Sequence, residues 1–346
     1  MTMDSFSEIY VKGKWVKVPA LTVNGKTIVS RGTWLKTAVI RSEEWLETGL
    51  DDPEGCISEL KKQRPQLGRA DIFTFAQKLP ATQPLHRYPM EWESVAAIHL
   101  TNFKEWWDKL PQATRKNVRR SQKRGVVVSV REFDDKLIEG LVELNNESPL
   151  RQGVRNAQYG KSFDQIKKDY SSFADRSDFI CAHFGKELVG FLKIVYRGEV
   201  ASILNLIPKA SHEDKRPANA LIERAVSLCA AKGVSYVTYG LFNYGNKHDS
   251  PLREFKIRNG FGEILVPRFY VPLTPWGSLC LKLKLHRGPL GILPHRVITW
   301  VVSGRAKWYS LKQSFVCRCS SMLERPNRNR QMGCSIPPAG SNSDPE

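Results

Sequence analysis

The spacing of apolar residues divides the middle of the chain into short helices and strands. Residues 126–133 form a run rich in β-branched residues, which is typical of a strand. Residues 134–146 then place leucine, isoleucine and valine at helical spacing, and a polar loop at 147–160 precedes a second amphipathic segment at 162–173. This pattern predicts a strand, a helix, a loop and a second helix.

Three further strand-like segments follow one another at residues 178–184, 187–196 and 200–208. Because only short glycine-containing turns separate them, they predict an antiparallel meander. A helix is expected to begin at Pro217, a favoured first-turn residue, and to end at Gly233. The remaining segments predict a strand at 234–240, a short helix at 251–260 and a last strand at 262–273.

The predicted order over residues 126–273 is therefore β-α-α-β-β-β-α-β-α-β. Nearer the N-terminus, Val/Thr/Trp-rich runs around Gly13 and Gly25 predict hairpins, and residues 54–63 have a helix-like pattern. We divide the chain into a smaller α+β accessory module at 1–100, a basic connecting helix at 101–125, a main domain at 126–275, a basic amphipathic extension at 276–319 and a disordered tail at 320–346.

The composition supports a globular protein with a strong positive charge. The 346 residues include 41% hydrophobic ones, which excludes wholesale disorder, collagen and a small disulfide scaffold. There are 53 Lys and Arg residues against 35 Asp and Glu, a formal net charge of +18. The excess is concentrated at residues 101–131 and after Gly277. Such a charge attracts RNA, phosphorylated substrates or anionic lipid surfaces without choosing among them, and a solvated helix face remains the alternative at 115–124.

Cysteine usage and hydropathy indicate the compartment. The seven cysteines are scattered and include no C-x-x-C pair, which favours a reduced, cytoplasmic protein. The N-terminus has no apolar run of signal-peptide length, and the longest uncharged stretch near the C-terminus is too short for a spanning helix. No His, Cys or Asp cluster has metal-ligand spacing. We expect a soluble protein that has no transmembrane segment and no metal.

Two motifs within this element order resemble those of a known superfamily. Residues 230–240 read AAKGVSYVTYG and residues 253–264 read REFKIRNGFGEI. Together with the order of elements, they resemble the Gcn5-related N-acetyltransferase (GNAT) superfamily. The TRKNVRR run at 114–120, the Phe255-Lys256 pair and the N-terminal module are most similar to Fem-type peptidyltransferases. The resemblance implies an α+β GNAT acyl-CoA N-acyltransferase fold with a mixed, mostly antiparallel central sheet.

The resemblance also implies a place for the acyl donor. In this superfamily, backbone amides at the start of the third helix bind the donor pyrophosphate, because a helix N-terminus favours an anion. The corresponding donor-binding residues here are Lys215, Arg216, Ala218, Asn219 and Ala220. The inner glycine of the family pattern is Ala218, and Pro217 removes one amide. Acetyl-CoA or another acyl-CoA is the expected donor, while a tRNA or acyl-carrier-protein donor and a plain helix start stay open.

The same fold implies where the chemistry takes place. The fourth strand diverges from the fifth, which places Asn205, Leu206 and Ile207 beside the acyl group. Asn205 is either a substrate contact or a bulge residue. Lys256 occupies the place where many relatives carry a tyrosine, and its cation would stabilise an oxyanion or hold a phosphate, unless it is an exposed helix lysine.

A proton relay and an acceptor site are also expected near the fork of these strands. Glu147 and Tyr244 are the candidates for the relay, with a surface charge and a packed aromatic as the alternatives. The candidate acceptor-binding residues come from two loops; they are Arg151, Gln152, Arg155, Tyr159, Tyr239 and Asn246. The arginines among them suit a phosphate or carboxylate.

Three functions are compatible with these residues. The first is N-acyl transfer, as by an acetyltransferase, from a thioester donor to an amine on a small molecule such as an amino sugar or a cell-envelope or polysaccharide precursor. The second is aminoacyl-tRNA-dependent transfer of the Fem type. The third is a non-catalytic protein on a decayed transferase fold that binds RNA or a membrane surface, for which basic and apolar residues mix at 282–300.

Overall fold

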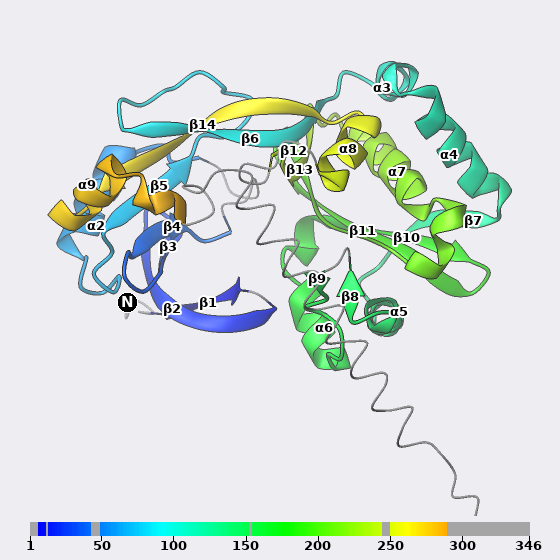
Figure 1. Cartoon of the computed structure of the whole chain (residues 1–346), viewed down its shortest axis with the longest axis horizontal. Coiled ribbons are helices and arrows are strands. Elements are labelled where there is room, and N and C mark those ends of the chain that lie inside the picture. Colours follow the sequence, from blue (N-terminus) through cyan, green and yellow to red (C-terminus); the bar gives the residue numbers. More distant parts are fainter. Residues whose placement is uncertain (1–5, 12, 43–48, 152–153, 244–249, 289–346) are drawn as a thin grey trace, which may run out of the picture. The chain divides into compact units, whose positions relative to one another are not determined.

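One continuous sheet contains strands from residue 6 to residue 272 of the described chain. The computed structural model describes residues 6–11, 13–42, 49–151, 154–243 and 250–288, all of which belong to one compact unit. In this part of the chain a 12-stranded sheet is formed, and most neighbouring strands in it are antiparallel (Figure 1). Its strands, in spatial order, are β1 (Phe6–Val11), β2 (Lys14–Val23), β3 (Lys26–Arg31), β4 (Thr37–Ile40), β5 (Ile72–Ala76), β14 (Gly262–Pro272), β6 (Met90–His99), β13 (Tyr236–Leu241), β12 (Val200–Pro208), β11 (Glu187–Arg197), β10 (Ser177–Phe184) and β7 (Val126–Arg131).

Helices and a small hairpin complete the described fold. The helices are α2 (Pro53–Lys62), α3 (Phe103–Lys109), α4 (Gln112–Lys123), α5 (Asp135–Asn146), α6 (Phe163–Tyr170), α7 (Pro217–Ala231), α8 (Pro251–Arg258) and α9 (Pro275–Lys282). Three 3-10 turns are η1 (Ala174–Arg176), η2 (Ala210–Lys215) and η3 (Leu285–Arg287), and the hairpin is β8 (Leu150–Arg151) with β9 (Val154–Arg155). The element order predicted over residues 126–273 is confirmed, with β8 and β9 as additions.

The two faces of the meander β10–β11–β12 are covered by different helices. Side chains alternate along β11, so Leu192 and Ile194 pack in the same apolar cluster as α7, whereas Phe191 packs with α5 and α6. Figure 1 accordingly shows α7 on one side of these strands and α5 and α6 on the other. A Cβ at Gly190 would lie 2.9 Å from Leu221 Cδ1, so the glycine allows α7 to approach the sheet closely.

The strand β6 connects the strands of the N-terminal region to those formed by residues 126–273. It pairs antiparallel with β14 on one side and with β13 on the other, and β14 in turn pairs with β5. Residues that the sequence analysis assigns to an accessory module therefore supply a central strand. The domain boundaries at residues 100, 125 and 275 stay predictions.

The basic segment 101–125 contains two helices rather than the single one predicted. α3 ends before Leu110, whose backbone is extended, and α4 begins after Pro111. The proline explains the break, because it has no N–H to donate and it disfavours a helical conformation in the preceding residue. The predicted C-terminal extension begins with α9 and η3; its remainder and the predicted tail at 320–346 lie outside the described residues.

Candidate active site

The parallel pair β12 and β13 separates partway along its length. The two strands pair only from Val200↔Tyr236 to Ser202↔Thr238, although β12 continues to Pro208. On its other side, β12 carries one extra residue, Leu204, where the register with β11 shifts. We call residues 203–208 of β12 and 239–241 of β13 the strand fork. The divergence expected from the resemblance is thus present, and none of the described strands pairs with the facing edges of the fork.

The residues predicted to lie beside the acyl group are found on one arm of the strand fork. Asn205 and Leu206 are half-buried, and Ile207 is buried. Asn205 pairs with Lys193 of β11, so it lies beside the bulge at Leu204 and is not itself the extra residue.

Lys256 of α8 lies against the β13 arm of the strand fork. The helix α8 places it there with no exposed surface, which contradicts the alternative of an exposed helix lysine. Its Nζ donates a hydrogen bond to the Leu241 carbonyl at 2.6 Å and lies 4.7 Å from the centre of the Tyr239 ring. Burial lowers the pKa of Lys256 to about 8. The structure therefore brings together Lys256 and Tyr239, two of the predicted site residues.

The helices α7 and α8 are joined by a pair of asparagines. Asn219 Nδ2 donates to Asn259 Oδ1 at 3.0 Å, and Asn259 Nδ2 donates to the Phe255 carbonyl at 2.7 Å. Asn259 is buried. Asn219, predicted as a donor contact, thus holds the first turn of α7 against the end of α8, and the sequence analysis did not single out Asn259.

The start of α7 is basic and has an unusual backbone. Arg216 adopts a left-handed conformation with φ 56°, and Pro217 follows it without an amide proton. Lys215 lies 3.5 Å from an Asp214 carboxylate oxygen, and Arg124 donates to the other oxygen at 2.8 Å. Arg216 Nε is buried without a hydrogen-bond partner in the described part of the chain. Arg124, the residue after α4, is a cation at this site that the sequence analysis did not assign to it.

Two residues of the predicted donor loop, Ala218 and Ala220, differ in burial. Ala218 is half-buried, whereas Ala220 is buried in the core beneath α7. The backbone N–H of Asn219 donates to the Arg216 carbonyl at 3.2 Å. At the start of α7 this amide is therefore already bonded, and the charged groups there are the side chains of Arg124, Lys215 and Arg216.

Glu147 is bonded to the loop that precedes α7. Its two carboxylate oxygens accept hydrogen bonds from the backbone N–H groups of Ala210 and Ser211, each at 2.8 Å. Burial alone would raise the pKa of Glu147, but these hydrogen bonds outweigh it and hold the pKa below its ordinary value. Glu147 is thus ionised at neutral pH and positions η2, the turn that leads to Arg216.

The predicted acceptor residues are only partly assembled. Arg151 Nη2 donates to the Leu144 carbonyl at 2.7 Å, which fixes its half-buried side chain to α5. Arg155 and Tyr159 are exposed. Gln152, Tyr244 and Asn246 lie outside the described residues.

A second buried lysine was missed by the sequence analysis. Lys193 has no exposed surface, and its Nζ donates to the carbonyl oxygens of Tyr170, at 2.7 Å, and of Ser172. Burial lowers the pKa of Lys193 to about 8. A signal was present in the sequence, because this lysine interrupts the apolar run of residues 188–196.

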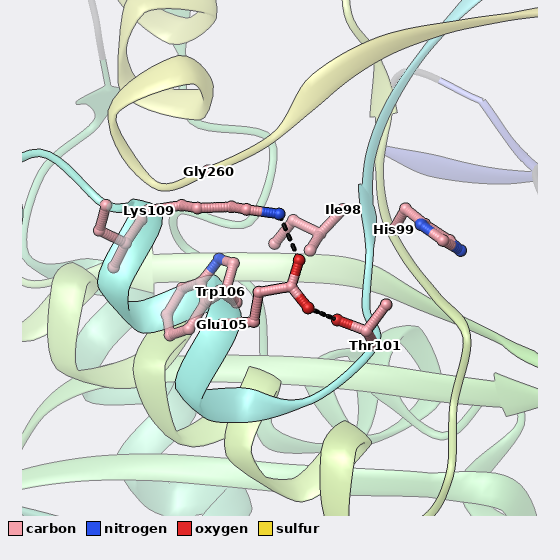
Figure 2. A pocket seen from close by; sticks show the side chains of 8 residues that line it. Ile98, His99, Thr101, Glu105, Trp106, Lys109 and Gly260 are labelled. Carbon is pink, nitrogen blue, oxygen red and sulfur yellow. Dashed lines mark hydrogen bonds and ion pairs between the residues drawn. The ribbon is translucent and has the colours of Figure 1, made fainter.

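The described residues also contain a small pocket of about 100 Å³ beside α3 (Figure 2). Figure 2 shows the carboxylate of Glu105 between Lys109 and Thr101, which both donate hydrogen bonds to it. Gly260 closes the pocket with φ +85°, and a Cβ there would lie 2.6 Å from Trp106 Nε1. The ion pair within the pocket is satisfied internally, so this pocket does not provide a site for a charged donor.

Within the described residues, no cluster of three or more His, Cys, Asp or Glu side chains has an arrangement suited to a metal ion. The described helices likewise include none that is long and apolar enough to cross a membrane.

The fold of the chain is similar to that of known structures, but its sequence matches a known protein over a short stretch. No protein-family model matches the chain. Protein CER1-like 2 of Arabidopsis thaliana is 32% identical over 95 residues, which cover 25% of this chain and 14% of that protein. The chain therefore matches only a small part of this curated relative.

Three solved structures share the fold over most of the chain. FemX has a TM-score of 0.54 at 10% identity, covering 81% of this chain and 90% of its own. The C-terminal domain (DUF2156) of a putative lysylphosphatidylglycerol synthetase from Agrobacterium fabrum has a TM-score of 0.52 at 14% identity, covering 78% and 88%. L-PGS from Bacillus licheniformis has a TM-score of 0.51 at 14% identity, covering 79% and 89%. The chain shares the fold of these three structures, and the predicted α+β fold class is confirmed.

Proposed function

We propose that this chain is an N-acyltransferase that moves an acyl group from a thioester donor such as acetyl-CoA to an amine, such as that of an amino sugar or a cell-envelope precursor. The observation that carries this proposal is the strand fork, with Lys256 buried against one arm and the basic start of α7 on the helix that packs behind the other. A transferase fold alone would not suffice, because one fold hosts many functions.

The strand fork suits the chemistry of acyl transfer. When an amine attacks the donor carbonyl, a negative charge develops on the carbonyl oxygen, and preorganised N–H groups or cations stabilise it. Backbone groups near Asn205 and Leu206 on β12 face the side that β13 has left. The Lys256 ammonium adds positive charge on the β13 side while its hydrogen bond to the Leu241 carbonyl fixes the shape of that arm. The thiolate then leaves and takes a proton.

The basic start of α7 suits the phosphates of the donor. Lys215, Arg216 and Arg124 converge near Asp214 and Glu213 in the described structure. A phosphate that binds there would exchange these weak, solvent-exposed ion pairs for stronger contacts to its own oxygens. Glu147 supports the arrangement by holding the amides of η2.

A second candidate donor, aminoacyl-tRNA, is favoured by the surface of α4. This helix exposes Lys116, Arg119, Arg120 and Lys123, contains no acidic residue and packs along α7. Such a face suits a nucleic-acid backbone, and also the acidic surface of an acyl-carrier protein. One of the similar structures is named for lysylphosphatidylglycerol, a lipid that carries an aminoacyl group.

Calorimetric titration with acetyl-CoA, free CoA and charged tRNA tests the proposal. Arg216→Ala is the test variant, and Arg197→Ala, an exposed arginine at the β11–β12 turn, is the matched control. We expect acetyl-CoA binding that weakens about tenfold in Arg216→Ala only, and release of free thiol when an amine acceptor is added.

The other outcomes separate the alternatives. Binding of charged tRNA with a steep salt dependence, without CoA binding, would move the proposal to aminoacyl transfer. Binding of neither donor would contradict a transferase and leave a non-catalytic protein that binds RNA or a membrane surface.

A further inference from the structure

The helix α9 and a nearby loop expose four large apolar side chains. Trp34 is 58% exposed, Trp276 44%, Leu279 46% and Leu283 58%. We call these four residues the α9 patch. Trp276, Leu279 and Leu283 are spaced three and four residues apart, so they share one face of the helical segment. Large apolar side chains grouped on a surface mark an interaction site far more often than single ones do.

The α9 patch is held rigidly from beneath. On the adjacent side of α9, Cys280 has no exposed surface and packs with Leu35 and Ile72. A Cβ at Gly277 would lie 2.0 Å from the Asp71 carbonyl oxygen, so the helix is in close contact with the chain below it. Because this inner face is fully occupied, the outer face is left without a partner in the described part of the chain.

The two tryptophans are oriented by a mutual contact. Their rings meet edge to face with centroids 6.4 Å apart, and Trp276 Nε1 donates to the Trp34 carbonyl at 3.3 Å. The apolar faces of both rings thus remain available while the indole N–H of Trp276 is satisfied. Tryptophan has a polar indole N–H and a large apolar ring, and it is enriched at the boundary between lipid headgroups and acyl chains.

The segments that form the patch carry positive charge only. Residues 31–36 and 274–288 include no Asp or Glu, and their cations are Arg31, Lys36, Lys282, Lys284 and Arg287. Arg287 pairs with Glu91 of β6, whereas Lys282 and Lys284 are exposed beside Leu283. An apolar face bordered by lysines is complementary to a bilayer that contains anionic lipid.

We propose that the α9 patch binds the surface of a membrane containing anionic phospholipid. Trp34, Trp276, Leu279 and Leu283 enter the headgroup and acyl boundary, and Lys282 and Lys284 contact lipid phosphates. The contact is peripheral, since α9 has only eight residues. This inference uses a surface distinct from the strand fork, so it does not depend on the proposed transferase activity.

Vesicle sedimentation of the full chain tests the proposal, with vesicles of pure phosphatidylcholine and vesicles containing about one third phosphatidylglycerol. The wild type is expected to bind the anionic vesicles and to lose binding at high salt. Trp276→Ser with Leu279→Ser is expected to weaken this binding at least about tenfold, because apolar area no longer leaves water. Lys282→Gln with Lys284→Gln is expected to weaken it about thirtyfold.

A matched control and a second measurement keep the test decisive. Val127→Ser with Val130→Ser removes exposed apolar side chains from β7, the last strand of the sheet, and is expected to leave binding unchanged. Circular dichroism verifies that each variant is folded. The proposal is overturned if the wild type does not bind anionic vesicles or if neither double variant weakens binding. It is also overturned if light scattering shows a dimer that Trp276→Ser with Leu279→Ser dissociates, because a second copy would then occupy the patch.

Discussion

Lys193 and Lys256 are two lysines that have the same burial but different surroundings. Neither has exposed surface, and burial lowers the pKa of each to about 8. Lys193 points from the middle of β11 to the carbonyl oxygens of Tyr170 and Ser172 at the end of α6, and its Nζ lies 5.3 Å from the centre of the Phe179 ring. Lys256 points from α8 to the Leu241 carbonyl and the Tyr239 ring at the end of β13.

The difference between them shows that a buried amine does not by itself mark an active site. Lys193 closes a loop against the sheet, at a place where the strands on both sides of β11 remain paired. Lys256 lies where β12 and β13 have separated. We therefore assign a stabilising role to Lys193 and a role in transfer to Lys256. The following variants test this assignment.

Lys193→Met is expected to give the largest loss of stability. Two buried carbonyls lose their donor, and the free energy of unfolding should fall by about 3 kcal/mol. Urea unfolding measures this loss. Donor binding by the folded fraction should not change. A variant as stable as the wild type would show that Lys193 does not clamp the loop.

Lys256→Met is expected to affect transfer more than stability. The variant loses the hydrogen bond to the Leu241 carbonyl, which costs about 1–2 kcal/mol of unfolding free energy. The rate of acyl transfer should fall about 100-fold, because one stabilising group for the oxyanion is removed. The wild-type rate should also vary with pH near 8, and this variation should be absent in the variant. Full activity in Lys256→Met would contradict the assignment.

Glu147→Gln tests how the donor loop is held beside the fork. The neutral amide retains one acceptor oxygen but loses the charge that strengthens two hydrogen bonds, so we expect a loss of about 1 kcal/mol in stability. Donor affinity should fall several-fold, measured by titration. Because the pKa of Glu147 is lowered in the folded state, the extra stability of the wild type over the variant should disappear as the pH falls below the ordinary glutamate range. An advantage that persists in acid would exclude this explanation.

Both lysines should also make the stability of the protein depend on pH. Each has a folded-state pKa of about 8 against an ordinary value of 10.5, so the folded state loses its proton first. Between these values the unfolded state binds more protons, and stability should rise with pH by up to about 1.4 kcal/mol per pH unit for each lysine. Each methionine variant should show a shallower rise than the wild type. Equal slopes in all three proteins would indicate that neither lysine titrates there.

The local elements were predictable from the sequence because their signals are local. The meander β10–β11–β12 follows from two short turns at Gly185 and Gly198, which both have positive φ in the structure. The helix α7 begins at Pro217 as predicted, and α2 lies within two residues of the helix expected at 54–63.

The neighbours of each strand were not predictable in the same way. The segment that forms β6 pairs with β13 and β14, which lie more than 130 residues further along the chain. No short-range pattern in the sequence indicates which of these distant strands become neighbours. Lys193 was missed for a related reason, since its acceptors belong to a loop about twenty residues away.

Hydrogen exchange of the backbone amides, with and without a saturating donor, tests most directly whether the active site lies at the strand fork; the donor is either acetyl-CoA or aminoacyl-tRNA. We expect one donor to slow exchange in residues 203–208 of β12 and in the first turn of α7, from Arg216 to Ala220, and to leave exchange around Tyr170 and Ser172 unchanged. A donor that binds while protecting neither segment would contradict the placement of the active site at the strand fork.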